Sequence, residues 1–572
     1  MRKTLAATLL ARPAFAVFNV ARTVVAVGAA TAAFAAVAVI ATSLSVRVDA
    51  QQANRPSLIT AEQLAGGTAN PAQWLMFGGD YSAKRHSPLT QINPQNVKNL
   101  VHQWTFQNGA QNQFETTPLV YDGVIYATGL NNTAWALDAK TGRPFWRYKR
   151  QLPEDLRVCC GPVNRGFGVL AHRLFMTTLD AHLVALDSRT GEVLWDIALD
   201  DYKRGYASTL APLVLKDKVI VGVAGGEYGA PGFIAAYDPE TGKRVWRFST
   251  VPAPGEKGAD TWEADSAERG GAGVWVTGTY DPELNMVYFG TGNPSPDFHG
   301  DDREGDNLFS NSLVALDAEK GTYRWHYQFT PHDVHDWDST HVPVLADLPI
   351  RGQARKVVMV ANRNGFFYTI DRTNGQLIVA KPYVYTSWAK EIGPDGRPVV
   401  LPDNSPTEKG AVSCPDLTGG TNFYPPSYDP TQKLFIVNVR ETCATYFGWK
   451  QDFKRGEWFL GGATQKADGP QGTFGALRAL DPATGERKWE VRYPGPGTAG
   501  VLTTASGLAF TGDDAGHVVA IDSHAGKVLW NYQMGAPVHG TSPITYMLGN
   551  RQFVVVPEGS TLVAFALPAA AR

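Results

Sequence analysis

Ala185-Leu-Asp-Ser-Arg-Thr-Gly-Glu-Val-Leu-Trp195 is one copy of a unit that recurs along this chain of 572 residues. We interpret it as a strand that ends in Ala-x-Asp, a turn that carries Thr-Gly, and a second strand that ends in Trp. The Asp carboxylate can accept hydrogen bonds from turn amides, and the Gly allows a positive φ. A copy without the Trp lies at 370–375. The further copies that end in Trp lie at 136–146, 236–246, 315–325, 479–489 and 520–530.

The spacing of the unit predicts an all-β propeller. We expect Trp104 to close a first unit. Between Trp104 and Trp246, successive repeat tryptophans lie 42, 49 and 51 residues apart. The tryptophans of the last two copies lie 41 residues apart. Such intervals suit one four-stranded blade, and the longer intervals must hold insertions. A closed ring leaves no sheet edge exposed. We therefore expect a C-terminal strand, at 553–556 or 562–566, to complete a blade that begins near the N-terminus.

Composition is typical of a globular protein and limits the possible partners. Hydrophobic residues make up 44% of the chain and charged residues 19%, while 58 glycines and 37 prolines fit many turns. The formal net charge of -2 gives no indication of a nucleic-acid partner. The chain has no Cys-x-x-Cys-His motif, which excludes covalently attached haem c.

Residues 1–50 predict export from the cytoplasm. They begin with basic residues, continue with an uncharged apolar run at 23–46, and end in Val48-Asp-Ala50, which resembles a cleavage site. The alternative is an uncleaved anchor in the inner membrane, because an apolar run of this length can span a bilayer. In either case we expect 51–572 to form a single propeller domain in the periplasm, where disulfides persist.

Four cysteines predict two disulfides. Cys159 and Cys160 are adjacent, and Cα atoms about 3.8 Å apart are closer than the usual spacing of roughly 4.4–6.8 Å, so a bond between them forms a strained, rigid ring. We favour this ring in an exported chain. The alternatives are two free buried thiols or a pair of metal ligands. Cys414 and Cys443 remain, and we expect them to pair with each other.

The repeats resemble the tryptophan-docking motifs of the pyrroloquinoline quinone (PQQ)-dependent alcohol dehydrogenases. In addition, Arg157-Val-Cys-Cys-Gly-Pro-Val-Asn-Arg165 is similar to the stretch that holds the vicinal disulfide of this family. The resemblance runs from about residue 70 to about residue 545, with the motifs in the family's order. It implies an eight-bladed β-propeller that holds PQQ near its central axis beside a cation. It also implies oxidation of a small alcohol to an aldehyde or ketone. Because the chain has no haem motif, we expect the electrons to pass to a separate carrier, a cytochrome c.

The same resemblance implies roles for individual residues. Asp336, three residues after Thr330-Pro-His-Asp333, matches the catalytic carboxylate. The matching cation ligands supply oxygen atoms, which suit a hard cation. The residues that match cation ligands, together with one further acid, are Glu227, Asn293, Asp336 and Asp338. The residues that match cofactor-binding positions are Glu115, Cys159, Cys160, Arg165, Thr209, Gly225, Gly226, Glu227, Trp275, Arg363 and Asn422.

Asp338 bears on the identity of the cation. The resemblance implies a small or uncharged residue at this place in calcium-dependent members of the family and Asp in lanthanide-dependent members. A trivalent ion is a stronger Lewis acid and accepts more oxygen ligands, so we favour a lanthanide over calcium. The alternative is that Asp338 only caps a turn.

Other readings fit parts of the pattern. His332, His335 and Asp336 could form an unrelated transition-metal site. Similar repeats also build non-enzymatic scaffold propellers that assist outer-membrane protein assembly, although such scaffolds are expected to lack vicinal cysteines. Two departures from the family concern the pocket. Ala224 replaces a frequent serine, so we expect one hydrogen bond fewer to the cofactor. Residues 553–561 contain no Trp where the larger alcohol dehydrogenases carry one, so we expect a wider or more polar pocket.

Overall fold

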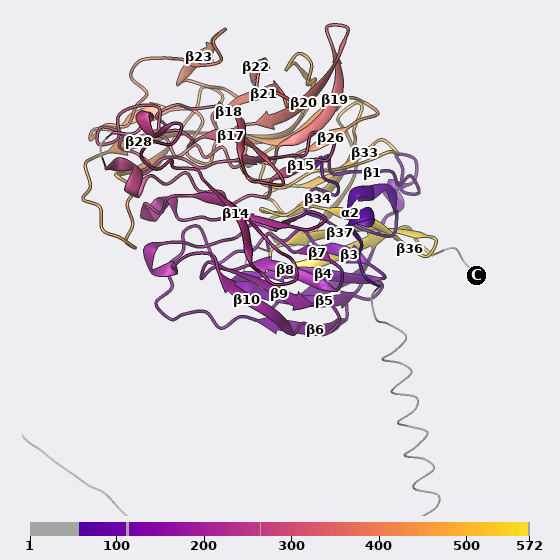
Figure 1. Ribbon diagram of the computed structural model, residues 1–572. Coiled ribbons are helices and arrows are strands. Elements are labelled where there is room, and N and C mark those ends of the chain that lie inside the picture. Colours follow the sequence, from indigo (N-terminus) through magenta and orange to yellow (C-terminus); the bar gives the residue numbers. More distant parts are fainter. Residues whose placement is uncertain (1–56, 110–113, 264, 570–572) are drawn as a thin grey trace, which may run out of the picture. The chain divides into compact units, whose positions relative to one another are not determined.

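Strands are the main regular secondary structure of the computed structural model, which describes residues 57–109, 114–263 and 265–569 (Figure 1). Among these residues, eight sheets contain four or five strands each, and two smaller sheets contain two and three strands. The helices are short, and the α-helix α2 (Ala61–Gly66) begins with a capping box at Thr60. The prediction of an all-β chain is confirmed.

Five of the larger sheets are built from four antiparallel strands that follow one another directly in the chain. Sheet by sheet, the strands are β3 (Leu119–Tyr121), β4 (Val124–Gly129), β5 (Thr133–Asp138) and β6 (Pro144–Lys149); β7 (Gly168–Leu170), β8 (Arg173–Thr177), β9 (His182–Asp187) and β10 (Val193–Ala198); β11 (Leu213–Val214), β12 (Val219–Gly222), β13 (Phe233–Tyr237) and β14 (Arg244–Ser249); β15 (Thr279–Asp281), β16 (Met286–Gly290), β17 (Ser312–Asp317) and β18 (Tyr323–Gln328); β19 (Val344–Ile350), β20 (Gln353–Ala361), β21 (Phe366–Asp371) and β22 (Leu377–Pro382).

Four of the other sheets combine strands that are farther apart in the chain, and the fifth is a hairpin of two consecutive strands. The three larger ones are β26 (Ser427–Asp429), β27 (Leu434–Glu441), β30 (Phe474–Leu480) and β31 (Arg487–Tyr493); β1 (His86–Ser87), β32 (Leu502–Thr504), β33 (Leu508–Gly512), β34 (His517–Asp522) and β35 (Lys527–Gln533); β2 (Val101–Gln107), β38 (Thr561–Ala566), β37 (Arg551–Glu558) and β36 (Ile544–Leu548). The smaller ones are β23 (Ala389–Ile392) and β24 (Pro398–Val400); β25 (Ala411–Ser413), β28 (Cys443–Gly448) and β29 (Gly462–Ala467). The 3-10 turns are η1 (Gly67–Ala69), η2 (Val97–Asn99), η3 (Leu130–Asn132), η4 (Tyr202–Arg204), η5 (Gly226–Tyr228), η6 (Ala259–Thr261) and η7 (Ser266–Arg269).

Six of the repeat tryptophans lie on edge strands, and the indole ring of each packs on the turn glycine of the next repeat. A Cβ atom added to Gly191 would lie 2.7 Å from the Trp146 ring, and the Trp146 Nε1 donates a hydrogen bond to the Ser188 carbonyl oxygen at 3.0 Å. In the copy without Trp, Lys381 lies against the next glycine, Gly485, instead. The other pairs of this kind are Trp104 with Gly142, Trp195 with Gly242, Trp246 with Gly321, Trp325 with Gly375, and Trp489 with Gly526.

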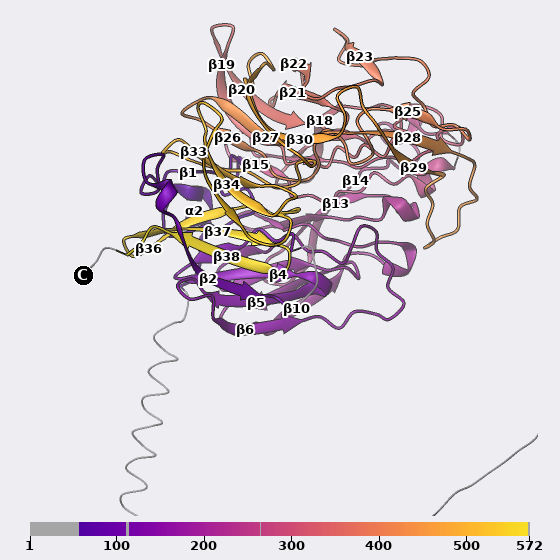
Figure 2. The same cartoon turned by 180° about the vertical axis from the view of Figure 1, so that it is seen from behind.

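Two N-terminal strands complete sheets that are otherwise C-terminal (Figure 2). β2 pairs with β38 in antiparallel fashion, so that Trp104 lies opposite Ala564. β1 pairs with β32 in parallel, with His86 opposite Thr503. The prediction that 562–566 completes a sheet begun near the N-terminus is confirmed.

Arg85 reinforces this closure from inside the protein. Its guanidinium group is fully buried and donates hydrogen bonds to the main-chain carbonyl oxygens of Phe77, Val501 and Pro543, at 2.5, 3.1 and 2.6 Å. A buried charge is tolerated only where its donors are satisfied. Arg85 therefore joins segments that are more than 400 residues apart in the sequence.

Both predicted disulfides are present. Cys159 is bonded to Cys160, and Cys414 is bonded to Cys443. The latter bond joins β28 to the residue that follows β25, within one three-stranded sheet. The two alternatives for the vicinal pair, free thiols and a pair of metal ligands, are therefore wrong.

The predicted export segment, 1–50, lies outside the described residues. Across the part of the chain that the structure describes, none of the helices has the length and apolar character needed to cross a membrane.

The contact between indole and glycine predicts a specific loss of stability. Gly321 has φ 67°, and a Cβ atom added to it would lie 2.4 Å from the Trp246 ring. Gly352 has φ 78° but open space around it, so it serves as a matched control. We expect Gly352→Ala to cost about 1–2 kcal/mol for the left-handed backbone. Gly321→Ala should cost about 1–3 kcal/mol more, because the indole must move. Urea unfolding measures both losses, and equal losses would contradict the contact.

Candidate functional site

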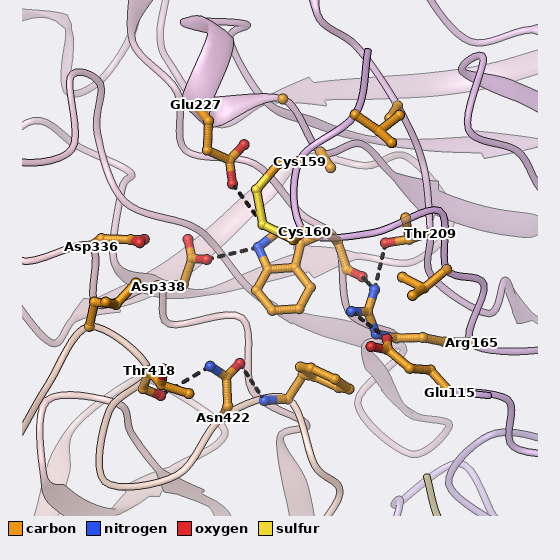
Figure 3. A pocket seen from close by; sticks show the side chains of 18 of the residues that line it. Glu115, Cys159, Cys160, Arg165, Thr209, Glu227, Asp336, Asp338, Thr418 and Asn422 are labelled. Atoms are coloured by element: carbon orange, nitrogen blue, oxygen red, sulfur yellow. Dashed lines mark hydrogen bonds and ion pairs between the residues drawn. A yellow bond between two sulfur atoms is a disulfide. The ribbon is translucent and has the colours of Figure 1, made fainter. Parts of the chain in front are cut away.

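A cavity of about 310 Å³ brings together residues from loops that connect strands of several sheets (Figure 3). It lies where the loops after β2, β6, β10, β12, β14, β18, β20, β25 and β35 meet. Gly226 and Asn293 do not line it, although both lie next to residues that do. The predicted site residues in its walls are Glu115, Cys159, Cys160, Arg165, Thr209, Gly225, Glu227, Trp275, Asp336, Asp338, Arg363 and Asn422.

One end of the cavity is built around Arg165. Its Nη2 lies 2.9 Å from the Glu115 Oε2, and its Nη1 donates to the Thr209 Oγ1 at 2.5 Å. The guanidinium carbon is 4.2 Å from the centre of the Phe423 ring and 4.8 Å from that of Trp275. All of these groups are at least partly buried, and burial lowers the pKa of Arg165 while it raises that of Glu115. This end therefore holds a desolvated ion pair.

The opposite end is built around the carboxylate of Asp338. Its Oδ1 accepts a hydrogen bond from the Asn293 backbone N–H at 2.8 Å. Its Oδ2 accepts one from the Trp275 Nε1 at 3.0 Å and forms an ion pair with the Arg363 Nη2 at 3.1 Å. A Cβ atom on Gly292 would lie 2.4 Å from the Oδ1, so only glycine lets the Asn293 loop approach so closely. Asp338 is thus held rigidly, and it does more than cap a turn.

Asp336 adopts a backbone conformation that is rare for residues other than glycine. Its φ is 58°, in the left-handed region, and such conformations persist only where the surroundings impose them. Here the Arg363 Nη1 donates to the Asp336 carbonyl oxygen at 2.8 Å and lies 3.5 Å from its Oδ1. The Arg363 Nη2 also donates to the Asn422 Oδ1 at 3.2 Å. Arg363 therefore connects three of the predicted site residues.

The carboxylates at this end repel one another. Burial raises the pKa of Glu227 to about 7, and the negative charge of Asp338 adds to the shift. Burial also raises the pKa of Asp336 well above its ordinary value, with Asp297, Asp338 and Glu227 adding to the shift and Arg363 opposing it. So many acids in one desolvated place are typical of a site that takes up a cation.

Asp297 belongs to this acidic group and was missed by the sequence analysis. It is 1% exposed, and its Oδ1 accepts a hydrogen bond from the Asn293 Nδ2 at 2.9 Å. Burial raises its pKa well above the ordinary value, and the charges of Glu227 and Asp338 add to that shift. One signal could have found it, because it follows a predicted ligand by four residues in Asn293-Pro-Ser-Pro-Asp297.

The vicinal disulfide forms part of the cavity wall. The Cys160 Sγ lies 3.9 Å from the Glu227 Oε1, and Cys160 has φ 68°. The two sulfurs and Glu227 lie near enough to share a metal ion. However, sulfurs that are bonded to each other are not thiolates, and only the thiolate is a good metal ligand. The disulfide is better suited to cover one face of a flat ligand.

The two histidines near Asp336 are engaged elsewhere. The His335 Nε2 hydrogen bonds with the Asn404 carbonyl oxygen at 2.9 Å, and its ring stacks on Trp337 with the ring centres 4.2 Å apart. The His332 Nδ1 hydrogen bonds with the Gly305 carbonyl oxygen at 2.9 Å. Neither lines the cavity. The arrangement gives no support to a transition-metal site made of these residues.

Comparison with known proteins agrees with the repeats and the cavity. A family model described as "Glucose/ethanol/alcohol dehydrogenase, beta-propeller domain" matches residues 74–382. The quinoprotein alcohol dehydrogenase PedH of Pseudomonas putida is 37% identical over 88% of this chain and 88% of its own length. This chain belongs to the PQQ-dependent quinoprotein alcohol dehydrogenase family.

Other relatives include a lanthanide-dependent and a europium-containing methanol dehydrogenase. The lanthanide-dependent methanol dehydrogenase of Methylacidiphilum fumariolicum is 37% identical over 86% of this chain and 85% of its own length. A solved structure of a europium-containing methanol dehydrogenase superposes with a TM-score of 0.84 at 33% identity, over 88% of this chain and all of that chain. A second family model, "Outer membrane protein assembly factor BamB", matches only residues 473–568.

The pKa of Glu227 predicts how pH affects the stability of protein freed of cations with a chelator. The folded-state pKa of about 7 lies above the ordinary value of 4.5, so the folded protein holds this proton more tightly than the unfolded chain. The contribution of this proton to the free energy of unfolding is therefore fully present below about pH 4.5 and is lost as the pH rises through about 7. We expect the urea midpoint to fall over this range. Glu227→Gln should flatten the profile, and an unchanged slope in that variant would contradict the assignment.

Proposed function

We propose that this protein is a periplasmic dehydrogenase that oxidises an alcohol to an aldehyde or ketone, with PQQ and one cation bound in the cavity. The observation that carries this proposal is one cavity that holds two buried arginines, Arg165 and Arg363, together with a group of carboxylates around Asp338. A small anionic quinone beside a cation needs both kinds of group. The eight larger sheets, with tryptophans docked on glycines, then correspond to the blades of an eight-bladed propeller.

The arginine side chains fit a ligand with several carboxylates. In the described chain, the Nε of Arg165 and the Nε of Arg363 are both buried without a hydrogen-bond partner. An unsatisfied buried donor is costly, so each is available to an anionic group. Cys159, Cys160 and Trp275 supply flat apolar surface in the same cavity. These residues would hold PQQ, whose own chemistry is the acceptance of a hydride.

The acidic end fits a hard cation. The Glu227 and Asp336 carboxylates and the Asn293 Oδ1 would hold it, with Asp338 beside them; such oxygen ligands suit calcium or a lanthanide. Bound there, the cation supplies Lewis acidity to the quinone. Asp336 lines the cavity with a raised pKa, so its carboxylate can take up the proton of the substrate hydroxyl. Arg363 orients Asp336 through its hydrogen bond to the carbonyl oxygen.

We propose a lanthanide in preference to calcium. Asp338 provides a further negative charge at the site, and relatives at 37% and 33% identity are named for a lanthanide and for europium. A trivalent ion gains more from that extra charge than a divalent ion does.

We further propose that the leader exports the protein. We also propose that electrons leave to a separate cytochrome c, because the chain has no haem motif.

The scaffold alternative has less support. Relatives that match most of the chain are named as dehydrogenases, whereas the BamB model matches only its last part. The propeller repeat alone does not distinguish the two functions, whereas the cavity and its acids favour the dehydrogenase.

Replacing Asp336 tests the proposed chemistry. Asp336→Asn keeps the shape but cannot accept the proton, so alcohol-dependent dye reduction by PQQ-loaded protein should fall about 100-fold or more. Absorbance of bound PQQ should persist, because Arg165 and the disulfide are unchanged. The exposed Asp260→Asn serves as the control and should keep full activity. Wild-type protein that binds PQQ yet reduces no dye with any of a panel of alcohols would refute the proposed function.

A second test concerns the cation. After metal removal, wild-type protein reloaded with lanthanum or cerium should oxidise alcohols, and calcium should restore less activity. Asp338→Ala should lose the lanthanide preference, because it removes one negative charge and three hydrogen-bond or ion-pair contacts. Metal analysis of the reloaded proteins checks occupancy. Full activity with calcium alone, unchanged in the variant, would rule out the lanthanide proposal.

A further inference from the structure

We infer that Asp297 is a positioning residue of the cation site: it orients the Asn293 amide oxygen toward the site and adds a buried negative charge that favours a trivalent over a divalent cation. This inference rests on the cation site of the proposed function and assigns a role to a residue outside the expected set of ligands.

The first part of the inference follows from hydrogen bonds. The Asn293 Nδ2 donates to the Pro294 carbonyl oxygen at 3.2 Å and to the Asp297 Oδ1 at 2.9 Å. Both hydrogens of the amide are thereby used. A carboxylate can only accept, so a flipped amide would place two acceptors against each other. Asp297 thus fixes the orientation of the Asn293 amide, with the Nδ2 toward Asp297 and the Oδ1 away from it.

The freed end of the amide faces the predicted ligands. A Cβ atom on Gly226 would lie 3.9 Å from the Asn293 Oδ1, which places this oxygen beside the η5 turn that carries Glu227. Across the described ranges, no donor contacts that oxygen. The backbone N–H of Asn293 is held by Asp338. Asn293 is therefore anchored on two sides by acids, and its amide oxygen remains available to a cation.

Asp297 itself is held in place from behind. The Arg303 Nη2 donates to the carbonyl oxygen of Pro296, the preceding residue, at 3.1 Å, and also to that of Asp333. The Arg303 Nη1 donates to the Asn307 Oδ1 at 2.7 Å. These contacts order the loop but leave the Asp297 carboxylate without a direct ion pair among the described residues. A buried carboxylate in that position attracts a cation placed on the other side of Asn293.

The second part of the inference follows from counting charge. The acids around the site are Glu227, Asp297, Asp333, Asp336 and Asp338, and the buried arginines that face them are Arg303 and Arg363. When all are ionised, five negative charges meet two positive charges. Three negative charges then remain. A divalent ion leaves one of them uncompensated, whereas a trivalent ion compensates all three. Without Asp297 the balance would suit a divalent ion.

The test measures cation binding directly, without PQQ or turnover. Full-length protein is freed of metal, and terbium binding is followed by luminescence sensitised through nearby tryptophans such as Trp275. Displacement of terbium by calcium then gives the ratio of the two affinities. Asp297→Asn removes the charge but keeps an acceptor for the Asn293 amide. Asp297→Ala removes both, and Asp301→Asn, an exposed acid in the same loop, serves as the matched control.

We expect Asp297→Asn to weaken terbium binding about 10-fold or more, as outer partners of metal ligands commonly do, with a smaller effect on calcium. The affinity ratio should therefore fall, which a loss of folding alone would not produce. Asp297→Ala should weaken both ions, and Asp301→Asn should match wild type. An unchanged ratio and affinity in Asp297→Asn would overturn this inference while leaving the cation site intact. Wild-type protein that binds neither ion would overturn the inference and the proposed cation site together.

Discussion

The packing of an indole ring on a glycine with positive φ is the contact on which this architecture depends. It recurs between successive repeats, with the ring Nε1 bonded to a carbonyl oxygen of the adjacent turn in several of them. A side chain on the glycine would separate the two repeats, so the contact selects both residue types at once. Because neighbouring sheets are joined in this way, the loops at one end of the sheets converge, and the cavity lies among them.

The cavity imposes a second constraint, which is the cost of buried charge. The charge of Arg165 is compensated by an ion pair with Glu115, and that of Arg363 by ion pairs with Asp336 and Asp338. Glu227 and Asp297, on either side of Asn293, are only partly compensated, and burial and mutual repulsion raise the pKa of each. A protein retains such a cluster where a ligand compensates it. The spare donors of the arginines and the spare charge of the acids point to two ligands of opposite sign, side by side.

The same arrangement explains why the resemblance to known dehydrogenases alone gave an incomplete list of site residues. Positions carried over by motif include the acids and arginines that form ion pairs across the cavity. They omit Asp297, which acts one layer behind Asn293, and they omit Phe423, which stacks on the Arg165 guanidinium. A family motif identifies residues near the reacting atoms, whereas buried and charged residues directly behind them also affect the site.

The sequence by itself determined the repeat, the turn glycines, both disulfides and the strand that closes the last sheet. These features depend on local backbone chemistry, on spacing and on the parity of the cysteines. It also placed most of the cavity wall, through motifs that are contiguous in the chain. Only the tertiary structure decided that Arg85 joins segments more than 400 residues apart, and that the amide of Asn293 lies between two acids. Such contacts arise where loops from different sheets meet, and sequence separation carries no information about that meeting.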